Sequence, residues 1–178
     1  MNIEFGCGEF PEREGYLTSD CRNKPGIDFV CNVWEIENYI DLNSVETVYS
    51  RHMFEHLTFA QGKRTLDSWH KILKPGGVCE IVMPNMAFHI RQWLYSRDDP
   101  EEFEHALAGL WGWQMDAPLW EKSCNTTADE QIEKVWDVHK SGYDIQSITE
   151  LLTEKGFTNI ESLEPDTSWH LHVKAVKV

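Results

Sequence analysis

The chain has 178 residues, 41% of them hydrophobic and 12% aromatic, so it is expected to fold as one globular domain, not to remain disordered. Thirty acidic against sixteen basic residues give a formal charge of −14, which disfavours duplex nucleic acid and anionic membranes as partners. The five cysteines form no C-x-x-C pair, and neither a signal peptide nor a membrane-spanning apolar run is present. We therefore expect reduced thiols in a cytoplasmic protein.

The first stretch of the chain predicts a short strand that breaks into a glycine turn. Residues 2–5 are mostly apolar and are followed by Gly6 and Gly8. Glycine lets main-chain N–H groups come close to a ligand, and open α/β sheets use this at the carboxyl end of the first strand. The third glycine of the dinucleotide fingerprint is missing, because Phe10 stands in its place. The turn alone is therefore a weak signal for a ligand site.

Three further strands are predicted before the first helix. Residues 16–19 form the second, which ends at Asp20, and the third and fourth cover 26–31 and 45–50. The connection across residues 6–15 is too short for a crossover helix, so we expect a loop there.

The first long helix is delimited by its capping signals. Thr58 with Gln61 matches a capping box, and 74–77, Lys-Pro-Gly-Gly, predicts the end of the helix and a turn. Residues 78–83 then read as a fifth strand. Strands that alternate with helical segments indicate a mostly parallel sheet.

The remainder of the chain predicts a helical insertion and a closing α/β unit. The last helix begins at Asp144 and is followed by strands at 159–163 and 170–176. We interpret residues 87–139 as an insertion within the single domain 1–178, because this segment shows no convincing strand. It carries five of the eight tryptophans: Trp93, Trp111, Trp113, Trp120 and Trp136. The expected fold is α/β and Rossmann-like, a mostly parallel sheet of about seven strands with the insertion between strand five and the last helix.

Several motifs occur in an order that resembles a known family. They are G-C-G at 6–8, an acidic residue at Asp20, S-R-H-M-F-E-H-L at 50–57, L-K-P-G-G at 73–77, L-W-G-W-Q at 110–114 and H-K-S-G-Y-D at 139–144. Together they resemble the class I S-adenosylmethionine-dependent methyltransferases, in particular a group of small predicted bacterial and phage methyltransferases. The resemblance covers nearly the whole chain.

The resemblance implies a site for S-adenosylmethionine. Glu4 and the glycine loop would hold its amino-acid end, Asp20 its ribose hydroxyls, and Asn32 its adenine amino group. Asn32 departs from the acidic residue that the family often has there. The implied cofactor-binding residues are Glu4, Gly6, Cys7, Gly8, Asp20, Asn32, Val33, Ser50, Arg51 and His52.

Methyl transfer from a sulfonium is an in-line displacement, so a base is needed only when the acceptor must lose a proton. The candidates are His52, His56 and His139, and we favour His52 because it directly follows strand four, with Glu55 as an orienting partner. His56 has the simpler interpretation of fixing the turn before the helix.

The site needs a cover, since no helix precedes the first strand in this sequence. We hypothesise that the tryptophan-rich segment 87–139 closes it as a lid. The alternative is that these tryptophans form the core of a fixed subdomain or a homodimer contact.

Two rival functions remain open. Residues 52–56 match H-x-x-E-H, the inverted zinc-peptidase motif, but that chemistry requires one continuous helix and Thr58 predicts a new helix directly afterwards. We therefore expect no metal ligands, and for His170 and His172 we expect packing or exposure at a sheet edge. The second rival is a non-catalytic module of methyltransferase fold that binds the cofactor or another partner. For an enzyme, the acceptor would be a small molecule, a sugar or a protein.

Overall fold

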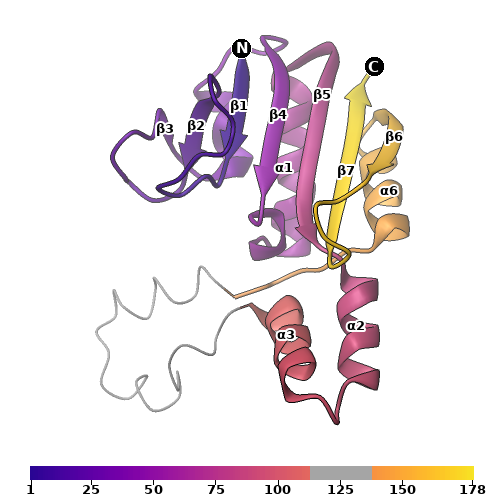
Figure 1. Ribbon diagram of the computed structural model, residues 1–178. Coiled ribbons are helices and arrows are strands. Elements are labelled where there is room, and N and C mark those ends of the chain that lie inside the picture. Colours follow the sequence, from indigo (N-terminus) through magenta and orange to yellow (C-terminus); the bar gives the residue numbers. More distant parts are fainter. Residues whose placement is uncertain (113–137) are drawn as a thin grey trace.

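The described part of the structure, a computed structural model, comprises residues 1–112 and 138–178. One seven-stranded sheet in the order β3-β2-β1-β4-β5-β7-β6 organises it, and Figure 1 shows these strands side by side. The strands are β1 (Asn2–Phe5), β2 (Leu17–Asp20), β3 (Phe29–Val30), β4 (Val45–Arg51), β5 (Leu73–Pro84), β6 (Phe157–Leu163) and β7 (His170–Lys177). The helices are η1 (Val33–Asn38), η2 (Phe54–His56), α1 (Phe59–Ile72), α2 (Met86–Tyr95), α3 (Pro100–Trp111) and α6 (Ile145–Glu154).

The sheet confirms the expected α/β class, but it is mixed. β1 pairs in parallel with β2 and β4, and β5 pairs in parallel with β4. β7 runs antiparallel to both β5 and β6. It reverses because a short connection, residues 164–169, joins it to β6, and such a connection can only form a hairpin. His170 and His172 therefore lie on an internal strand and not at the sheet edge that the sequence predicts.

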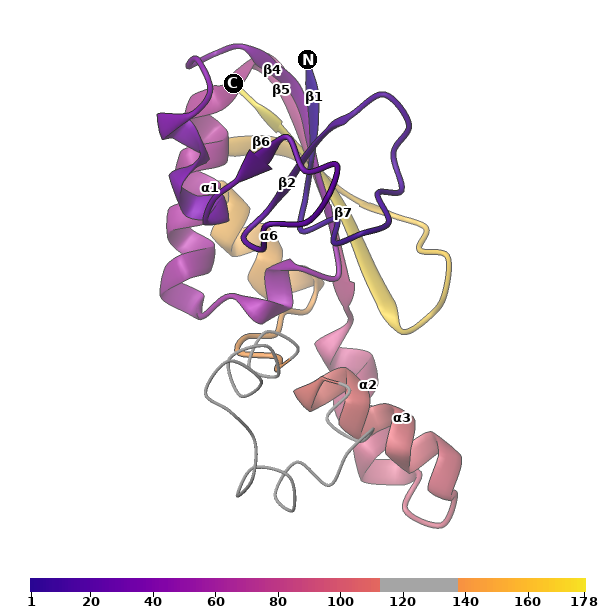
Figure 2. The ribbon, with the colours of Figure 1, turned by 90° about the vertical axis from the view of Figure 1, so that its left-hand side faces the viewer.

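Helix α1 begins at the predicted cap and supplies the core. Thr58 Oγ1 accepts from the Gln61 N–H, and the Gln61 side chain reciprocates, which completes the capping box. Trp69 is fully buried, with its ring 5.0 Å from Phe5 and 6.1 Å from Phe54. An aromatic side chain that buries about 150 to 250 Å² contributes roughly 4 to 6 kcal/mol. Figure 2 shows α1 and α6 on the same face of the sheet.

The opposite face carries polar side chains and is crossed by the loop that joins β1 to β2. Glu4 accepts hydrogen bonds from the backbone N–H groups of Glu12 and Arg13. The Arg13 guanidinium lies 4.1 Å from the centre of the Tyr49 ring and forms an ion pair with Glu80 at 2.6 Å. The expected short crossover loop is confirmed, and these contacts hold it in place.

Two predicted strands have different bounds. The third is shorter than 26–31, because Gly26 turns at a φ of 84° and the exposed Asp28 accepts hydrogen bonds from Thr18. The fifth starts at Leu73, which pairs with Val45, whereas Val78 already pairs with Thr47. Residues 74–77 thus form a bulge within β5, where the sequence suggests a turn before it.

The predicted insertion begins with helices α2 and α3, which pack against each other and project beyond the carboxyl ends of the parallel strands (Figure 1). Trp113, Trp120, Trp136 and Cys124 lie outside the described residues. The four described cysteines have free thiols. No helix in residues 1–112 and 138–178 is both long and apolar enough to span a membrane.

Candidate active site

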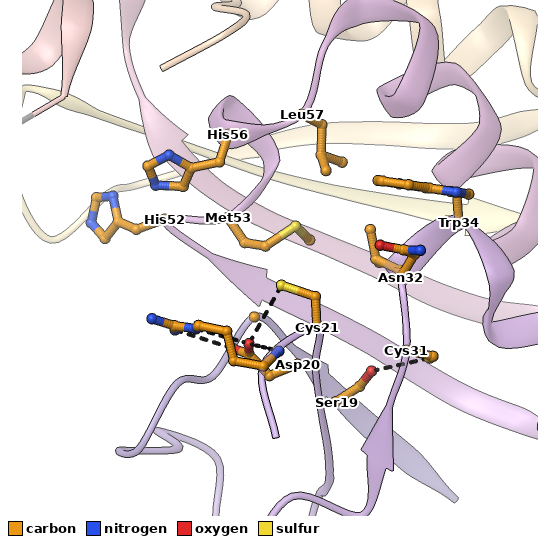
Figure 3. A pocket seen from close by; sticks show the side chains of 13 residues that line it. Ser19, Asp20, Cys21, Cys31, Asn32, Trp34, His52, Met53, His56 and Leu57 are labelled. Atoms are coloured by element: carbon orange, nitrogen blue, oxygen red, sulfur yellow. Dashed lines mark hydrogen bonds and ion pairs between the residues drawn. The ribbon is translucent and has the colours of Figure 1, made fainter. Parts of the chain in front are cut away.

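A pocket opens at the carboxyl ends of β1, β2 and β4, where the sequence places its ligand site. We name it the Asp20 pocket, and its lining residues are Gly6, Ser19, Asp20, Cys21, Arg22, Cys31, Asn32, Val33, Trp34, His52, Met53, His56 and Leu57. Figure 3 shows His52 and His56 at one end and Asn32 and Trp34 toward the other. Five of the ten predicted cofactor residues line it: Gly6, Asp20, Asn32, Val33 and His52.

Asp20 is the buried anion of this pocket, with a relative exposure of 5%. Its Oδ2 accepts from the Gly8 N–H at 3.0 Å, and its Oδ1 accepts from the Arg22 N–H at 2.9 Å and from Arg22 Nε at 3.1 Å. Burial acts to raise the pKa of Asp20, but the hydrogen bonds from Arg22 and Gly8 outweigh it and lower the pKa. Asp20 is therefore a carboxylate at neutral pH, as a partner for two ribose hydroxyls must be.

Gly6 allows a close approach that no other residue would permit. Its φ is 69°, and a Cβ at this position would lie 2.3 Å from the Met53 Cγ. The turn after β1 therefore packs directly beneath the segment that follows β4. Cys7 and Gly8 continue the turn outside the pocket lining, and burial is the main reason that the pKa of the Cys7 thiol is raised to about 11.

Asn32 lines the pocket and keeps its amide oxygen available as an acceptor. Its amide nitrogen donates to Glu35 Oε2 at 3.0 Å, which leaves Oδ1 as the acceptor. This is the orientation that the proposed contact with an adenine amino group requires. Trp34 lines the pocket two residues later and adds an aromatic wall.

Three predicted residues point elsewhere. Glu4 holds the crossover loop, as described above. Ser50 is fully buried within β4, and its hydroxyl has no hydrogen-bond partner among the described residues. Arg51 forms ion pairs with Asp166 at 2.6 Å and Glu12 at 3.3 Å on the far face of the sheet. Ser50 and Arg51 are neighbours on β4, and neighbouring side chains on a strand face opposite sides of the sheet.

A second space, of about 460 Å³, adjoins the first and contains most of the histidines. We name it the histidine cavity. Six of the eight histidines in the chain line it, together with Glu55, Pro84, Ala108, Gly109 and Trp169: His52, His56, His89, His105, His139 and His170. Helices α2 and α3 contribute His89, His105 and Gly109. The described half of the insertion therefore forms one wall of this cavity.

The imidazoles of this cavity surround a buried carboxylate. Glu55 is 1% exposed, and its Oε1 lies 3.3 Å from His52 Nδ1. Burial acts to raise the Glu55 pKa, but the hydrogen bond from His52 and the nearby His56 lower it. Burial lowers the pKa of His139, and it lowers that of His89 to about 4, so both rings are neutral at pH 7.

His52 has a backbone conformation that is unusual for a residue with a side chain. Its φ is 48°, in the left-handed region. This conformation ends β4 and directs the imidazole to the border of the two cavities, since His52 lines both. The five residues of the H-x-x-E-H motif consequently do not form one helix: η2 covers only Phe54–His56, and α1 starts anew at Phe59. The geometry of an inverted zinc peptidase is absent from this segment.

Sequence reasoning missed several residues of both spaces. Cys21, Arg22 and Trp34 follow strand ends by one to four positions, and that proximity is the signal that could have found them. His89 and His105 come together from different helices, with ring centres 5.2 Å apart, and no local pattern predicts this.

A parallel sheet with an antiparallel seventh strand, a glycine turn after β1 and a buried acid at the end of β2 define a Rossmann-like domain. Residues 15–81 match the family described as "Methyltransferase domain". No curated protein matches the sequence significantly. The family match and the fold together confirm the resemblance to class I S-adenosylmethionine-dependent methyltransferases.

Solved structures share this fold at low identity. A SAM-dependent methyltransferase from Archaeoglobus fulgidus is 14% identical, with 99% of this chain and 85% of that one covered and a TM-score of 0.58. The 1,6-didemethyltoxoflavin-N1-methyltransferase of Burkholderia thailandensis, bound to 1,6-didemethyltoxoflavin and S-adenosylhomocysteine, is 12% identical, with 99% and 70% covered and a TM-score of 0.55. The CurJ carbon methyltransferase is 13% identical, with a TM-score of 0.57, and 98% of this chain spans only 47% of it. At these identities the likeness concerns the fold.

Proposed function

We propose that the chain is a methyltransferase that binds its cofactor in the Asp20 pocket and a small hydroxylated acceptor in the histidine cavity. The observation that supports this most is the shared border, because His52 and His56 line both spaces. In-line displacement requires the donor and the acceptor atom to face each other at close range. Two cavities that meet at a pair of side chains can provide this arrangement.

The cofactor is S-adenosylmethionine, which supplies an electrophilic methyl group when bound. Asp20 would accept the ribose hydroxyls, Asn32 Oδ1 would accept the adenine amino group, and Trp34 would lie against the ring. The turn at residues 6–8 would hold the amino-acid end. The lowered pKa of Asp20 suits the first of these roles, because an ionised carboxylate offers two acceptor oxygens.

His52 is the proposed general base for a hydroxyl acceptor. Its Nδ1 faces the Glu55 carboxylate at 3.3 Å, which fixes the ring and would stabilise the imidazolium after proton uptake at Nε2. His139 is a weaker candidate for the base than His52. Its Nδ1 donates to the Gly109 carbonyl. His139 lines the histidine cavity but not the Asp20 pocket.

The segment 87–139 would act as the acceptor-binding wall. Its described helices α2 and α3 already supply His89, His105 and Gly109 to the cavity. The ring nitrogens of an imidazole are hydrogen-bonding groups, which suits a sugar or another polar small molecule more than an apolar one.

The test has two stages. Calorimetric titration with S-adenosylhomocysteine should show binding, and absence of binding would refute the proposed cofactor site. Transfer from radiolabelled S-adenosylmethionine to a panel of sugars and phenols should then identify an acceptor class.

With that acceptor, His52→Gln should lower kcat by about 10² to 10⁴, the range for general bases, and leave the Kd for S-adenosylhomocysteine unchanged. The matched control is His172→Gln, a histidine that also contacts a glutamate, Glu80 at 2.9 Å, but lines neither cavity. Equal losses of kcat and affinity in His52→Gln would reject the role as base. Cofactor binding without transfer to any acceptor would favour the non-catalytic module.

A further inference from the structure

Three potential metal ligands converge inside the histidine cavity. They are Glu55, His56 and His139, and one ligand atom from each lies within 4.8 Å of the other two. Tetrahedral zinc with bonds of about 2.05 Å has ligand atoms roughly 3.3 Å apart, so small side-chain rotations would complete the arrangement.

Both histidines are held in the tautomer that leaves Nε2 available to a metal. His56 Nδ1 lies 3.3 Å from the Val138 carbonyl oxygen, and His139 Nδ1 lies 3.0 Å from that of Gly109. A carbonyl oxygen can only accept, so each Nδ1 carries the hydrogen and each Nε2 keeps its lone pair. Metal-ligating histidines typically donate their second nitrogen in this way.

The carboxylate provides an independent observation. Glu55 is 1% exposed, and its Oε1 faces His52, but its Oε2 is buried and accepts no hydrogen bond from the described residues. A buried carboxylate oxygen without a partner is costly, because it loses hydration and gains nothing in return. A cation bound between this oxygen and the two imidazoles would remove that cost.

The backbone holds the three residues together. The Glu55 carbonyl oxygen accepts from the N–H groups of Lys140 and Ser141 at 2.8 and 3.1 Å. These hydrogen bonds fix the segment that carries His139 against η2. The grouping is therefore a feature of the fold rather than a chance approach of surface side chains.

We propose that Glu55, His56 and His139 bind one divalent transition-metal ion, with zinc as the best match to a set of two imidazoles and one carboxylate. This assignment differs from the H-x-x-E-H reading, in which His52 is a ligand and Glu55 a base. Three protein ligands leave a fourth position open to the cavity, where the ion would bind an oxygen of the acceptor. That role rests on the proposed function, whereas the metal site itself does not.

The test uses the full chain without an affinity tag, stripped with a chelator and desalted. Titration with Zn²⁺ by calorimetry should give one site per chain. Titration with Co²⁺ should give visible d–d absorption bands, which report coordination directly. Glu55→Gln and His139→Gln should each weaken Zn²⁺ binding at least tenfold, and His172→Gln should leave it unchanged.

Circular dichroism and thermal melting establish that each variant is folded, and if one ligand variant fails to fold the other decides. No stoichiometric Zn²⁺ binding, or equal binding by wild type and ligand variants, would overturn the proposal. S-adenosylhomocysteine is titrated separately into the stripped protein. Binding of S-adenosylhomocysteine together with no stoichiometric Zn²⁺ binding would reject the metal site and retain the proposed cofactor site. Stoichiometric Zn²⁺ binding without binding of S-adenosylhomocysteine would retain the metal site and reject the proposed cofactor site.

Discussion

Replacement of Asp20 by alanine should abolish most of the cofactor affinity. A carboxylate that accepts two hydroxyls forms two charge-assisted hydrogen bonds, each worth about 1.5 to 3 kcal/mol. Ribose must compete with the Arg22 guanidinium, whose side chain is 40% exposed, and such a partly exposed pair contributes only about 1 kcal/mol or less. The net loss is therefore at least about 2 kcal/mol, or roughly 30-fold in Kd.

Calorimetry with S-adenosylhomocysteine measures this loss, and Asp28→Ala is the matched control. Asp28 also accepts from a β2 residue, Thr18, at 2.8 and 3.0 Å, but it does not line the Asp20 pocket. Asp20→Asn, which keeps one acceptor oxygen, should lie between wild type and Asp20→Ala. A Kd for Asp20→Ala within threefold of wild type, in a folded variant, would refute the ribose assignment.

Two further predictions concern the same pocket. Gly6→Ala and Gly15→Ala both place a side chain at positive φ, 69° and 78°, at a cost of about 1 to 2 kcal/mol, but only the Gly6→Ala side chain meets Met53. Gly6→Ala should therefore lower the free energy of unfolding in denaturant by about 1 to 3 kcal/mol more than Gly15→Ala, and should weaken cofactor binding. Equal losses of stability in the two variants would contradict the packing argument. Burial, with a smaller contribution from the Asp20 charge, raises the Cys21 pKa to about 11, so its alkylation by iodoacetamide should accelerate tenfold per unit from pH 7 to 10. S-adenosylhomocysteine should protect Cys21 in peptide mapping, since this residue lines the pocket.

Local patterns predicted the fold well where short-range chemistry decides it. The Thr58 capping box, the Asp144 cap and the glycine turn at Gly6 all have the expected geometry. β3 was overestimated because an apolar run does not reveal that Asp28 folds back on Thr18. The reversal of β7 depends on its short link to β6, which the pattern of strands and helices alone does not resolve.

In the candidate site, too, the residues set by local patterns were predictable and those set by long-range contacts were not. Asp20 and Asn32 were predictable, because Asp20 is the last residue of β2 and Asn32 lies two residues after β3, where both strands end at the pocket. Arg51 was not, since the alternation of β4 sends it to the other face. The grouping of His139 with Glu55 depends on backbone hydrogen bonds between segments far apart in the chain, which spacing along the sequence does not encode.

The left-handed backbone of His52 lowers the stability of the fold at a residue that we propose as the general base. Glycine would adopt the same φ without the Cβ penalty of roughly 1 to 2 kcal/mol, so a sequence selected for thermostability alone would favour glycine there. That choice would also delete an imidazole that borders both cavities and orients Glu55. If His52 is the proposed base, the stability lost to its left-handed backbone is what the chemistry requires at residue 52.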